Sequence, residues 1–482
     1  MKVAVVGGGA AGLFAALLLA RAGHEVLVLE RDPIEPAPDV EAAAAAAFRS
    51  AAPQIVQPHN IMARSRELLV QRLPDVYDGL LAAGVAEAPL WMQMPASLAD
   101  KAARPGDERL TTLMTRRSTV DWVLQRTARA EPGVTLRGGV RVSGLIAVPG
   151  RPPHVTGVRT AQGDVPADLV IDASGRRSPI DGWLSDIGAR PTLLRRAECG
   201  LAYFSRHYRL RSAARLPGLP SARIVAGLDE FTVGKWGGDN GAIQIAVAPL
   251  AADRRFRPLR HPGVFTAVLR TIPVYAAWLD VADPISEIFP MAGLHNTLRR
   301  LVVDGTPVAT GLHAIGDAVC TTNPTFGRGL SFALSGALDL LDVIGRHATD
   351  PTAQALAMDG LVARHVVPFY EDQAAIDHAR LAALRHCVFG APEPAPPPTD
   401  SGRITYAQLR TAAASDPVAF RAFWKIYGMT CLPDEVYADP YVVACTRWAA
   451  REYGGAPPVP EPPREMVLAA LGGNGQSSWG RP

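Results

Sequence analysis

The chain has 482 residues and nearly balanced charges, with 49 lysines and arginines against 46 aspartates and glutamates. This length exceeds what one compact core usually holds, so two or three structural units are expected. The charges form no block of one sign, which argues against a nucleic-acid partner. No apolar stretch approaches the roughly 18 residues of a membrane span, so no integral membrane association is expected.

The five cysteines are widely spaced, and no Cys-x-x-Cys pair or cluster of cysteine and histidine is present. We therefore expect free thiols, no bound metal and a cytoplasmic location. Three consecutive glycines at positions 7 to 9 interrupt the first apolar stretch, which is not the pattern of a signal peptide.

The first thirty residues predict a strand, a glycine-rich turn, a helix and a second strand. Residues 2–6 are apolar on both faces, residues 7–12 read Gly-Gly-Gly-Ala-Ala-Gly, residues 11–22 favour a helix, and residues 25–29 form the second strand. This order sets Gly-x-Gly-x-x-Gly in the context in which it binds a dinucleotide. The diphosphate is expected at the helix N-terminus, whose free N–H groups and dipole favour negative charge.

Each position of this segment has an expected role. Gly7 permits the tight turn, Gly9 lets the backbone approach the diphosphate, and Gly12 lets the helix pack closely on the sheet. Glu30 follows the second strand, where its carboxylate can accept hydrogen bonds from ribose hydroxyls. The candidate cofactor residues here are Gly7, Gly9, Ala10, Ala11, Gly12, Glu30 and Arg31.

Two later segments carry further motifs. Residues 168–178 contain an apolar strand that runs into Asp-Ala-Ser-Gly-Arg-Arg-Ser, beginning at Asp172. Residues 307–317 are expected to form another buried strand, ending in Gly-Asp. Residues 323–330 then read Asn-Pro-Thr-Phe-Gly-Arg-Gly-Leu and precede an apolar helix that ends near Leu341.

These motifs resemble those of the flavoprotein monooxygenases of the p-hydroxybenzoate hydroxylase type, including the squalene-epoxidase-like members. In that family a Gly-Asp pair, here Gly316 and Asp317, ends a strand and hydrogen-bonds the ribityl chain of FAD. The following Pro-x-x-Gly-x-Gly starts a helix that faces the pyrimidine edge of the isoalloxazine. A helix N-terminus there stabilises negative charge on the reduced flavin. The matching residues are Pro324, Gly327, Arg328, Gly329 and Leu330.

The resemblance extends to three more positions near the cofactor. Asp172 matches an acidic residue over the nucleotide, and the Ala-Ser-Gly that follows is typical of the epoxidase-like branch. Arg117 opens an expected helix and matches an arginine near the flavin, with a surface helix cap as the alternative. Gln57 and His59 match a Gln/His-bearing helix start beside the flavin. His59 is the one candidate for a catalytic role, and a structural role is its alternative.

Alternating apolar and polar residues over 198–250 predict an antiparallel sheet with a hairpin near Gly237–Gly241, and residues 263–278 favour a helix. In the resembled family such a sheet walls the substrate cavity. Its aromatic side chains are candidate lining residues, with core packing as the alternative: Tyr203, Phe204, Phe231 and Trp236.

The fold class implied is α/β: a Rossmann-type FAD-binding domain with an inserted antiparallel-sheet substrate domain and a C-terminal helical extension. The FAD-binding domain would be discontinuous, over residues 1–185 and 285–345. The substrate domain would span 186–284, and the C-terminal helical cap and tail 346–482. A Pro-rich linker is expected at 391–402.

The function implied is that of an FAD-dependent monooxygenase that hydroxylates or epoxidises a bulky apolar or aromatic molecule in specialised metabolism, through a flavin C4a-hydroperoxide. Its partners would be the organic substrate, dioxygen and NAD(P)H, which would act directly or through a flavin reductase. A flavin-dependent halogenase is an alternative, although the chain lacks Trp-x-Trp-x-Ile-Pro and has only four lysines. A flavin dehydrogenase or double-bond reductase, and a non-catalytic flavin-binding protein, are also open.

Overall fold

The computed structural model describes residues 1–35, 37–48, 53–98, 100–212, 214–218, 220–395, 402–453 and 459–472. Its first layer is a sheet of five parallel strands in the order β21-β10-β1-β2-β6. The strands are β1 (Lys2–Val6), β2 (Glu25–Leu29), β6 (Val134–Arg137), β10 (Leu169–Asp172) and β21 (Leu312–Ala314). The strand order reverses at β1, and ligands of open α/β sheets bind beyond the carboxyl ends of strands at such a point.

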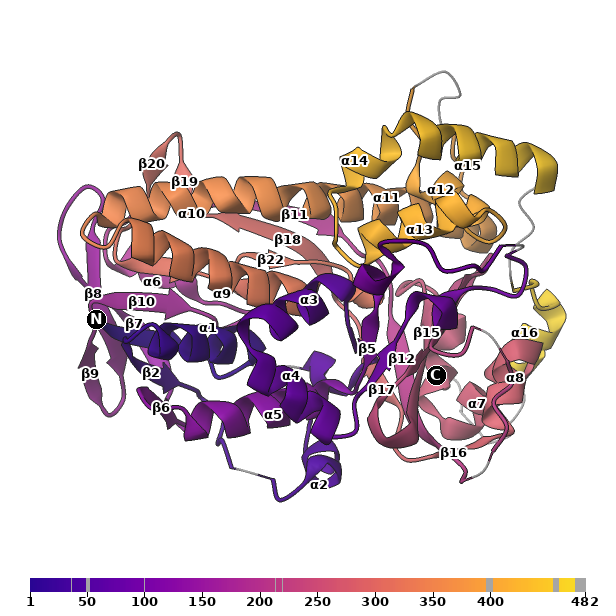
Figure 1. The fold of residues 1–482 in the computed structure, drawn as a ribbon, viewed down its shortest axis with the longest axis horizontal. Helices are drawn as coiled ribbons and strands as arrows, with labels where there is room; N and C mark the ends of the chain where they lie inside the picture. Colours follow the sequence, from indigo (N-terminus) through magenta and orange to yellow (C-terminus); the bar gives the residue numbers. More distant parts are fainter. Residues whose placement is uncertain are drawn as a thin grey trace, which may run out of the picture.

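Helices cover one face of this sheet, and a small antiparallel sheet covers the other (Figure 1). Val3 and Val5 of β1 pack toward the helices, whereas Ala4 and Val6 pack toward the small sheet. Burial on both faces explains the continuous apolar run of β1. The covering helices are α1 (Ala10–Arg21), α3 (Ala63–Arg72), α4 (Pro74–Ala82), α5 (Arg117–Ala130), α9 (Gly329–Arg346) and α10 (Pro351–His365). The small sheet is made of β7 (Val142–Val148), β8 (His154–Thr160) and β9 (Gly163–Pro166).

A second, larger antiparallel sheet, which we call the middle sheet, lies beside this domain (Figure 1). Its order is β13-β14-β15-β12-β16, with β17 also paired to β12. The strands are β12 (Tyr203–Leu210), β13 (Arg223–Gly227), β14 (Phe231–Gly237), β15 (Ala242–Pro249), β16 (Ala282–Pro284) and β17 (Phe289–Met291). One face packs against α7 (Pro262–Arg270), α8 (Pro273–Leu279) and α16 (Arg464–Gly472), forming a separate core around residues such as Phe265 and Trp278.

The remaining elements join the two sheets. A three-stranded sheet contains β11 (Leu193–Glu198), β18 (His295–Arg300) and β22 (Cys320–Thr321), and the long helix α11 (Val367–Phe389) packs on β11 and β18. The C-terminal helices lie together at one end of α11 (Figure 1). They are α12 (Tyr406–Ala412), α13 (Pro417–Tyr427), α14 (Pro433–Tyr437) and α15 (Pro440–Tyr453). Short elements complete the fold: α2 (Val40–Ala45), α6 (Ile180–Asp186), β3 (Asn60–Ile61), β4 (Ala86–Ala88), β5 (Thr112–Met114), β19 (Val302–Val303) and β20 (Thr306–Pro307).

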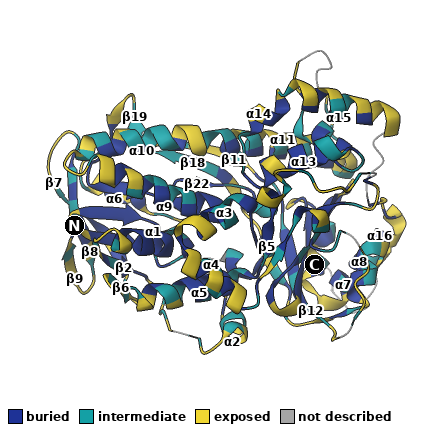
Figure 2. Ribbon diagram, viewed as in Figure 1, coloured by how far each residue is buried: buried dark blue, intermediate teal, exposed yellow. Residues whose placement is uncertain are grey.

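The expected fold class is confirmed: a parallel Rossmann-like core, antiparallel sheets and C-terminal helices. The middle sheet also includes Phe289–Met291, which lies beyond the expected end of the insert at residue 284. Figure 2 shows that the strands of both sheets are mostly buried. Within the described ranges, no helix combines the length and the apolar character that crossing a bilayer requires.

The prediction of one strand is wrong. Residues 307–317 do not form a continuous strand, because Thr306–Pro307 pairs back on β19 as a short hairpin. The chain then turns at Gly311, which has a φ of +69°, and only Leu312–Ala314 pairs with β10. Of the expected linker at 391–402, residues 396–401 lie outside the described part of the chain.

Candidate functional site

A cavity of about 560 Å³ lies beyond the carboxyl ends of β1 and β2. Its walls come from the glycine-rich turn before α1, the Ala173–Arg177 loop after β10, the segment from Asp317 to Leu330, and Met291 of β17 in the middle sheet. This volume is in the range of small-molecule and cofactor pockets. Segments more than three hundred positions apart in the sequence therefore line one space.

The three motif glycines have different surroundings. Gly7 has a φ of +111°, and a Cβ there would lie 2.5 Å from the carbonyl oxygen of Ala173. A Cβ on Gly12 would lie 1.9 Å from the carbonyl oxygen of Gly7, so this glycine serves the packing of α1 and does not line the cavity. Gly9 lines the cavity and has an ordinary φ of −78°, and a Cβ on it would meet no atom within 4 Å. A side chain at position 9 would enter open cavity space.

The N-terminus of α1 is open toward this space. Gly9 is the N-cap residue, and no side chain caps the helix. Ala10 and Ala11 also line the cavity, so the unpaired N–H groups of the first turn and the helix dipole are available to an anion. The residues present therefore fit the diphosphate of a dinucleotide.

Glu30 and Arg31 line the cavity at the end of β2. The Glu30 carboxylate is fixed by two main-chain donors: Gly8 N–H donates to Oε2 at 2.7 Å, and Asp32 N–H donates to Oε1 at 2.9 Å. Each carboxylate oxygen keeps a further acceptor position, which agrees with the role expected toward ribose hydroxyls.

The opposite part of the cavity is lined by Asp317, Pro324, Gly327, Gly329 and Leu330. Helix α9 begins at Gly329, and no side chain caps its N-terminus. Burial raises the pKa of the Asp317 carboxyl, while the charges of Arg117 and Arg176 oppose that shift. Two uncapped helix N-termini, those of α1 and α9, thus face the same cavity, as a flavin dinucleotide requires at its diphosphate and its isoalloxazine.

Four expected cofactor residues do not line the cavity, among them Gly12 and Gly316. Asp172 is buried and accepts hydrogen bonds from the hydroxyls of Ser174 and Ser178, and burial raises its pKa. This carboxyl therefore holds the loop whose other residues line the cavity. The amide of Gln57 donates to the Phe289 carbonyl at 3.1 Å and accepts from Ser205 Oγ at 2.8 Å, which ties its segment to the middle sheet.

Arg328 lines the cavity, but its guanidinium binds residues of α11. It donates to the carbonyl of Phe369 at 2.7 Å and pairs with Asp372 at 2.6 Å, and its side chain is fully buried. This arginine connects the segment before α9 to α11. Arg117 also lines the cavity, and its Nε donates to Asp121 Oδ1 at 2.8 Å, one helical turn along α5.

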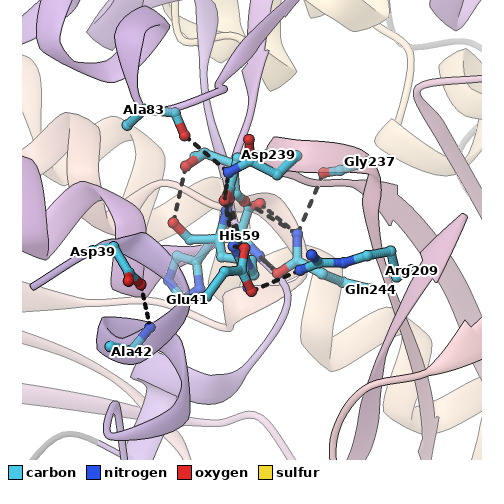
Figure 3. A network of polar contacts seen from close by, with 12 residues as sticks. Asp39, Glu41, Ala42, His59, Ala83, Arg209, Gly237, Asp239 and Gln244 are labelled. Atoms are coloured by element: carbon cyan, nitrogen blue, oxygen red, sulfur yellow. Dashed lines mark hydrogen bonds and ion pairs between the residues drawn. The ribbon is translucent and has the colours of Figure 1, made fainter.

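His59 lines the cavity and is held by its main chain against Gln244 of β15 (Figure 3). Its Nδ1 lies 2.9 Å from the carbonyl oxygen of Gln57. Burial, together with the charge of Arg117, lowers the pKa of His59 to about 4. The ring is therefore neutral at pH 7, with its proton on Nδ1 toward the carbonyl and Nε2 left as an acceptor.

An ion-pair network beside His59 was not expected from the sequence (Figure 3). The guanidinium of Arg116, only 2% exposed, pairs with the fully buried Asp239 at 2.6 Å and with Glu41 at 2.7 Å. Arg209 of β12 also pairs with Glu41. These contacts join α2, the start of α5 and the β14–β15 hairpin.

Sequence reasoning also missed Asp121, Arg141, Arg176 and Arg177, all of which line the cavity. Two of them stand in the Asp-Ala-Ser-Gly-Arg-Arg-Ser run, which was a usable signal, whereas Arg141 belongs to no motif. Of the expected aromatic lining residues, none borders this cavity. Phe204 and Phe231 belong to the core of the middle sheet, as the alternative reading anticipated.

No group of three or more histidine, cysteine, aspartate or glutamate side chains in the described part of the chain is arranged to hold a metal ion. All five cysteines are unpaired.

The chain is similar to known flavoproteins. Residues 2–104 match the family model described as FAD dependent oxidoreductase. Protein Rv3254 of Mycobacterium tuberculosis is 25% identical over 474 residues, covering 91% of each chain. PqsL of Pseudomonas aeruginosa, described as a probable FAD-dependent monooxygenase, superposes with a TM-score of 0.58 at 16% identity, over 81% of this chain and 98% of that chain. The flavin-dependent brominase Bmp2 superposes with a TM-score of 0.61 at 16% identity, over 94% of this chain and 99% of that chain.

The N-terminal segment 2–104 is thus similar to FAD-dependent oxidoreductases. The chain has the fold shared by FAD-binding monooxygenases and halogenases.

Proposed function

We propose that this protein is an FAD-dependent monooxygenase that hydroxylates or epoxidises a bulky apolar or aromatic molecule. The observation that carries the proposal is the single cavity lined at one end by the uncapped N-terminus of α1 and at the other by that of α9. FAD, when bound there, supplies two-electron redox chemistry and the reaction of its reduced form with dioxygen.

The residues of this chain have separate tasks in the proposed reaction. Gly9 and the first turn of α1 would bind the diphosphate, and Asp317 would accept hydrogen bonds from the ribityl chain. The N–H groups at Gly329 and Leu330 would stabilise negative charge on the reduced flavin.

The wall near the middle sheet has to exclude water, because water would divert reduced flavin and dioxygen to hydrogen peroxide. Met291 and Leu294 provide an apolar part of that wall, and His59 lies in it as a neutral ring. The free Nε2 of His59 can accept a hydrogen bond from substrate or from a reacting hydroxyl, which makes this residue our candidate for positioning the substrate.

A flavin-dependent halogenase is the second candidate, because Bmp2 and the halogenase CmlS share the fold. A lysine that captures hypohalous acid would have to reach the flavin cavity. The four lysines are unsuited to this: Lys2, Lys101 and Lys425 are exposed away from the cavity lining, and Lys235 is buried in the middle sheet with its Nζ over the Trp278 ring at 3.5 Å. This distribution favours oxygen transfer.

We propose NAD(P)H as the source of electrons, used directly or through a partner flavin reductase. A second Gly-x-Gly-x-x-Gly unit is absent from the sequence, so direct binding would use the open side of the flavin cavity. We propose specialised metabolism as the setting of the reaction.

The test is turnover of the reduced holoprotein with isotopically labelled dioxygen and a panel of aromatic and polycyclic molecules, with and without bromide. We expect oxygen uptake coupled to a product that carries one labelled oxygen, unchanged by halide. Halogenated product would establish the second candidate. Substrate oxidation or double-bond reduction without incorporation of labelled oxygen would contradict oxygen transfer.

A further inference from the structure

The segment before α9 that lines the flavin cavity is attached to α11 at both of its ends. At the α9 end, Arg328 forms the buried ion pair with Asp372. At the other end, the side-chain amide of Asn323 donates to Asp377 Oδ1 at 2.9 Å. Pro324 lies between these two attachments and lines the cavity. Helix α11 therefore determines where this part of the cavity wall lies.

The carboxyl group of Asp377 is only 1% exposed and is bound by neutral amide groups. Besides Asn323, the amide of Asn296 in β18 donates to its Oδ2 at 2.8 Å. The amide of Gln373, one helical turn away in α11, donates to its Oδ1 at 3.1 Å. Among the described residues, no ion pair includes Asp377. A carboxylate at this place is therefore held by hydrogen bonds alone.

The side chain of Asn323 transmits this attachment to the cavity wall. Its Oδ1 accepts from the main-chain N–H of Thr325 at 3.2 Å and so caps the short 3₁₀ turn Pro324–Phe326. The hydroxyl of Tyr203 donates to the same oxygen. Since the nitrogen of this amide binds Asp377, a change at that carboxyl reaches the turn through one side chain.

One charged side chain acts on this carboxyl. Burial raises the pKa of Asp377 to about 6, and the amide donors and the positive charge of Arg380, one turn further along α11, oppose that shift. The other ionisable groups beside it are the Tyr203 hydroxyl and the Cys199 thiol, and burial raises the pKa of both, so they stay neutral. Asp377 can therefore change its charge near neutral pH while its neighbours keep theirs.

The neutral form of Asp377 also has a hydrogen-bond partner in place. Gln373 Oε1 is buried and accepts no hydrogen bond from the part of the chain that the structure describes. A half-turn of the Gln373 amide would present this oxygen to the O–H of a protonated Asp377. An asparagine at position 377 could donate to the same oxygen. The site thus accommodates a charged and a neutral side chain.

We propose that Asp377 is a positioning residue for the flavin, whose negative charge lowers the reduction potential of bound FAD and couples that potential to pH. The carboxylate holds the turn at the cavity wall through Asn323. It also places a negative charge behind the segment that leads to the N-terminus of α9, where the reduced flavin is to be stabilised. The inference rests on the proposed binding of FAD and does not require oxygen transfer.

The proton balance follows from the repulsion between the two negative charges. Two electrons and one proton convert oxidised FAD into its anionic reduced form. The new negative charge favours the protonated form of Asp377, which takes a further proton from solvent. Reduction of the flavin and protonation of this carboxyl therefore favour each other by the same factor.

The expected pH dependence follows from the two pKa values that Asp377 has in the two redox states. With oxidised FAD its pKa is about 6, and the charge of the reduced flavin raises it. Below about pH 6 the carboxyl is protonated in both states, and above the raised pKa it is ionised in both. Between these values only the reduced protein holds the proton, so the potential should fall more steeply with rising pH.

The experiment measures the midpoint potential of the FAD-loaded protein by anaerobic titration with dithionite, from about pH 5 to about pH 9. We expect the steep window just above pH 6 in the unmodified protein and its absence in Asp377→Asn. Above the window, the equilibrium constant for reduction should be at least about tenfold larger in the variant, a potential about 30 mV more positive for two electrons. Below the window, the two potentials should agree.

Two further variants sharpen this comparison. Glu371→Gln is the control, because it removes one negative charge from the exposed side of α11, where Glu371 pairs with Arg195. Its potential should equal that of the unmodified protein at every pH. Arg380→Gln removes the positive charge that lowers the pKa of Asp377, so the steep window should move to higher pH.

Equal potentials of Asp377→Asn and the unmodified protein at every pH, or a steep window that persists in the variant, would overturn the inference. The profile of the unmodified protein needs no variant, and a profile without the window would overturn it as well. Failure of the proposed function is distinguishable. Protein that binds no FAD would contradict both, whereas the expected potentials without coupled oxygen uptake would contradict monooxygenation alone.

Discussion

The flavin cavity and the region beneath the C-terminal helices are built from different parts of the polypeptide. Around the turn before α1 and the start of α9, the cavity is bounded largely by main chain, and glycines leave N–H groups free. Beneath the C-terminal helices, by contrast, side chains of Arg223, Arg380 and Arg410 converge from three distant elements. The first region should be damaged by added atoms, because it depends on close approach. The second should be sensitive to removed charges.

The largest effect expected in the first region follows from Gly12→Val. The added Cβ would lie 1.9 Å from the carbonyl oxygen of Gly7, and main chain cannot move aside cheaply. We expect loss of the folded protein, with little soluble material and no cooperative unfolding transition. Gly345→Val is the control. Gly345 also lies in a helix, α9, and a Cβ on it would meet no atom within 4 Å. A stable Gly12→Val protein would contradict the packing described for α1.

The next effect concerns the connection between the two regions. Arg328→Leu removes one partner of a fully buried ion pair and leaves Asp372 uncompensated. Breaking such a pair costs about 3–5 kcal/mol, so thermal and denaturant unfolding should both show a large loss of stability. The double variant Arg328→Leu with Asp372→Leu should recover part of it. If the single variant unfolds like the unmodified protein, the segment before α9 is not held by α11.

Asp317→Asn should have an intermediate effect that is confined to the cofactor. The amide keeps the shape of the side chain but loses the charge-assisted hydrogen bonds to the ribityl chain, worth about 1.5–3 kcal/mol. We expect FAD to bind about 10- to 100-fold more weakly, with little change in the stability of the apoprotein. The affinity is measured by equilibrium dialysis, with flavin fluorescence reporting the free FAD. Unchanged affinity would remove Asp317 from the proposed site.

The smallest effect concerns a buried charge in the middle sheet, that of Lys235. Burial lowers the pKa of Lys235 to about 7 from an ordinary value of 10.5. Below pH 7 the lysine is charged in both the folded and the unfolded chain, and the folded state bears the full cost of the buried charge. Between about pH 7 and 10.5 only the unfolded chain holds the proton, so the stability of the unmodified protein should rise with pH through this window.

Lys235→Met should therefore stabilise the protein at pH 7 by about 1–2 kcal/mol, with the advantage shrinking toward pH 10. The comparison is made by urea unfolding at several pH values. A variant that is less stable than the unmodified protein at every pH would show that the contacts of Lys235 with the Ser221 carbonyl and the Trp278 ring outweigh its desolvation.

The difference between sites built from main chain and sites built from side chains explains which features the sequence could predict. Recognition by main chain leaves a local signature, because only particular glycines at fixed spacing allow it, and Gly7 and Gly9 could be found for that reason. The strand–turn–helix order gave the fold class, and alternation in residues 198–250 gave the middle sheet.

Other features could not be predicted, because they depend on tertiary contacts between distant elements. Nothing near Arg380 in the sequence indicates that its guanidinium meets Thr232, and nothing near Arg116 indicates Asp239. The motif residues Arg328 and Gln57 were expected beside the cofactor, but the side chains of both are engaged in contacts with other elements, which a one-dimensional motif cannot reveal.

The central claim is that FAD lies against Gly9 at the N-terminus of α1, and the visible spectrum of purified Gly9→Val tests it most directly. The φ of −78° at this residue accommodates a side chain, and no atom lies within 4 Å of its Cβ, so the variant should fold normally. We predict that the Gly9→Val protein is folded but colourless, whereas the unmodified protein is yellow and shows the absorption of oxidised flavin. Yellow, flavin-loaded Gly9→Val would contradict this site.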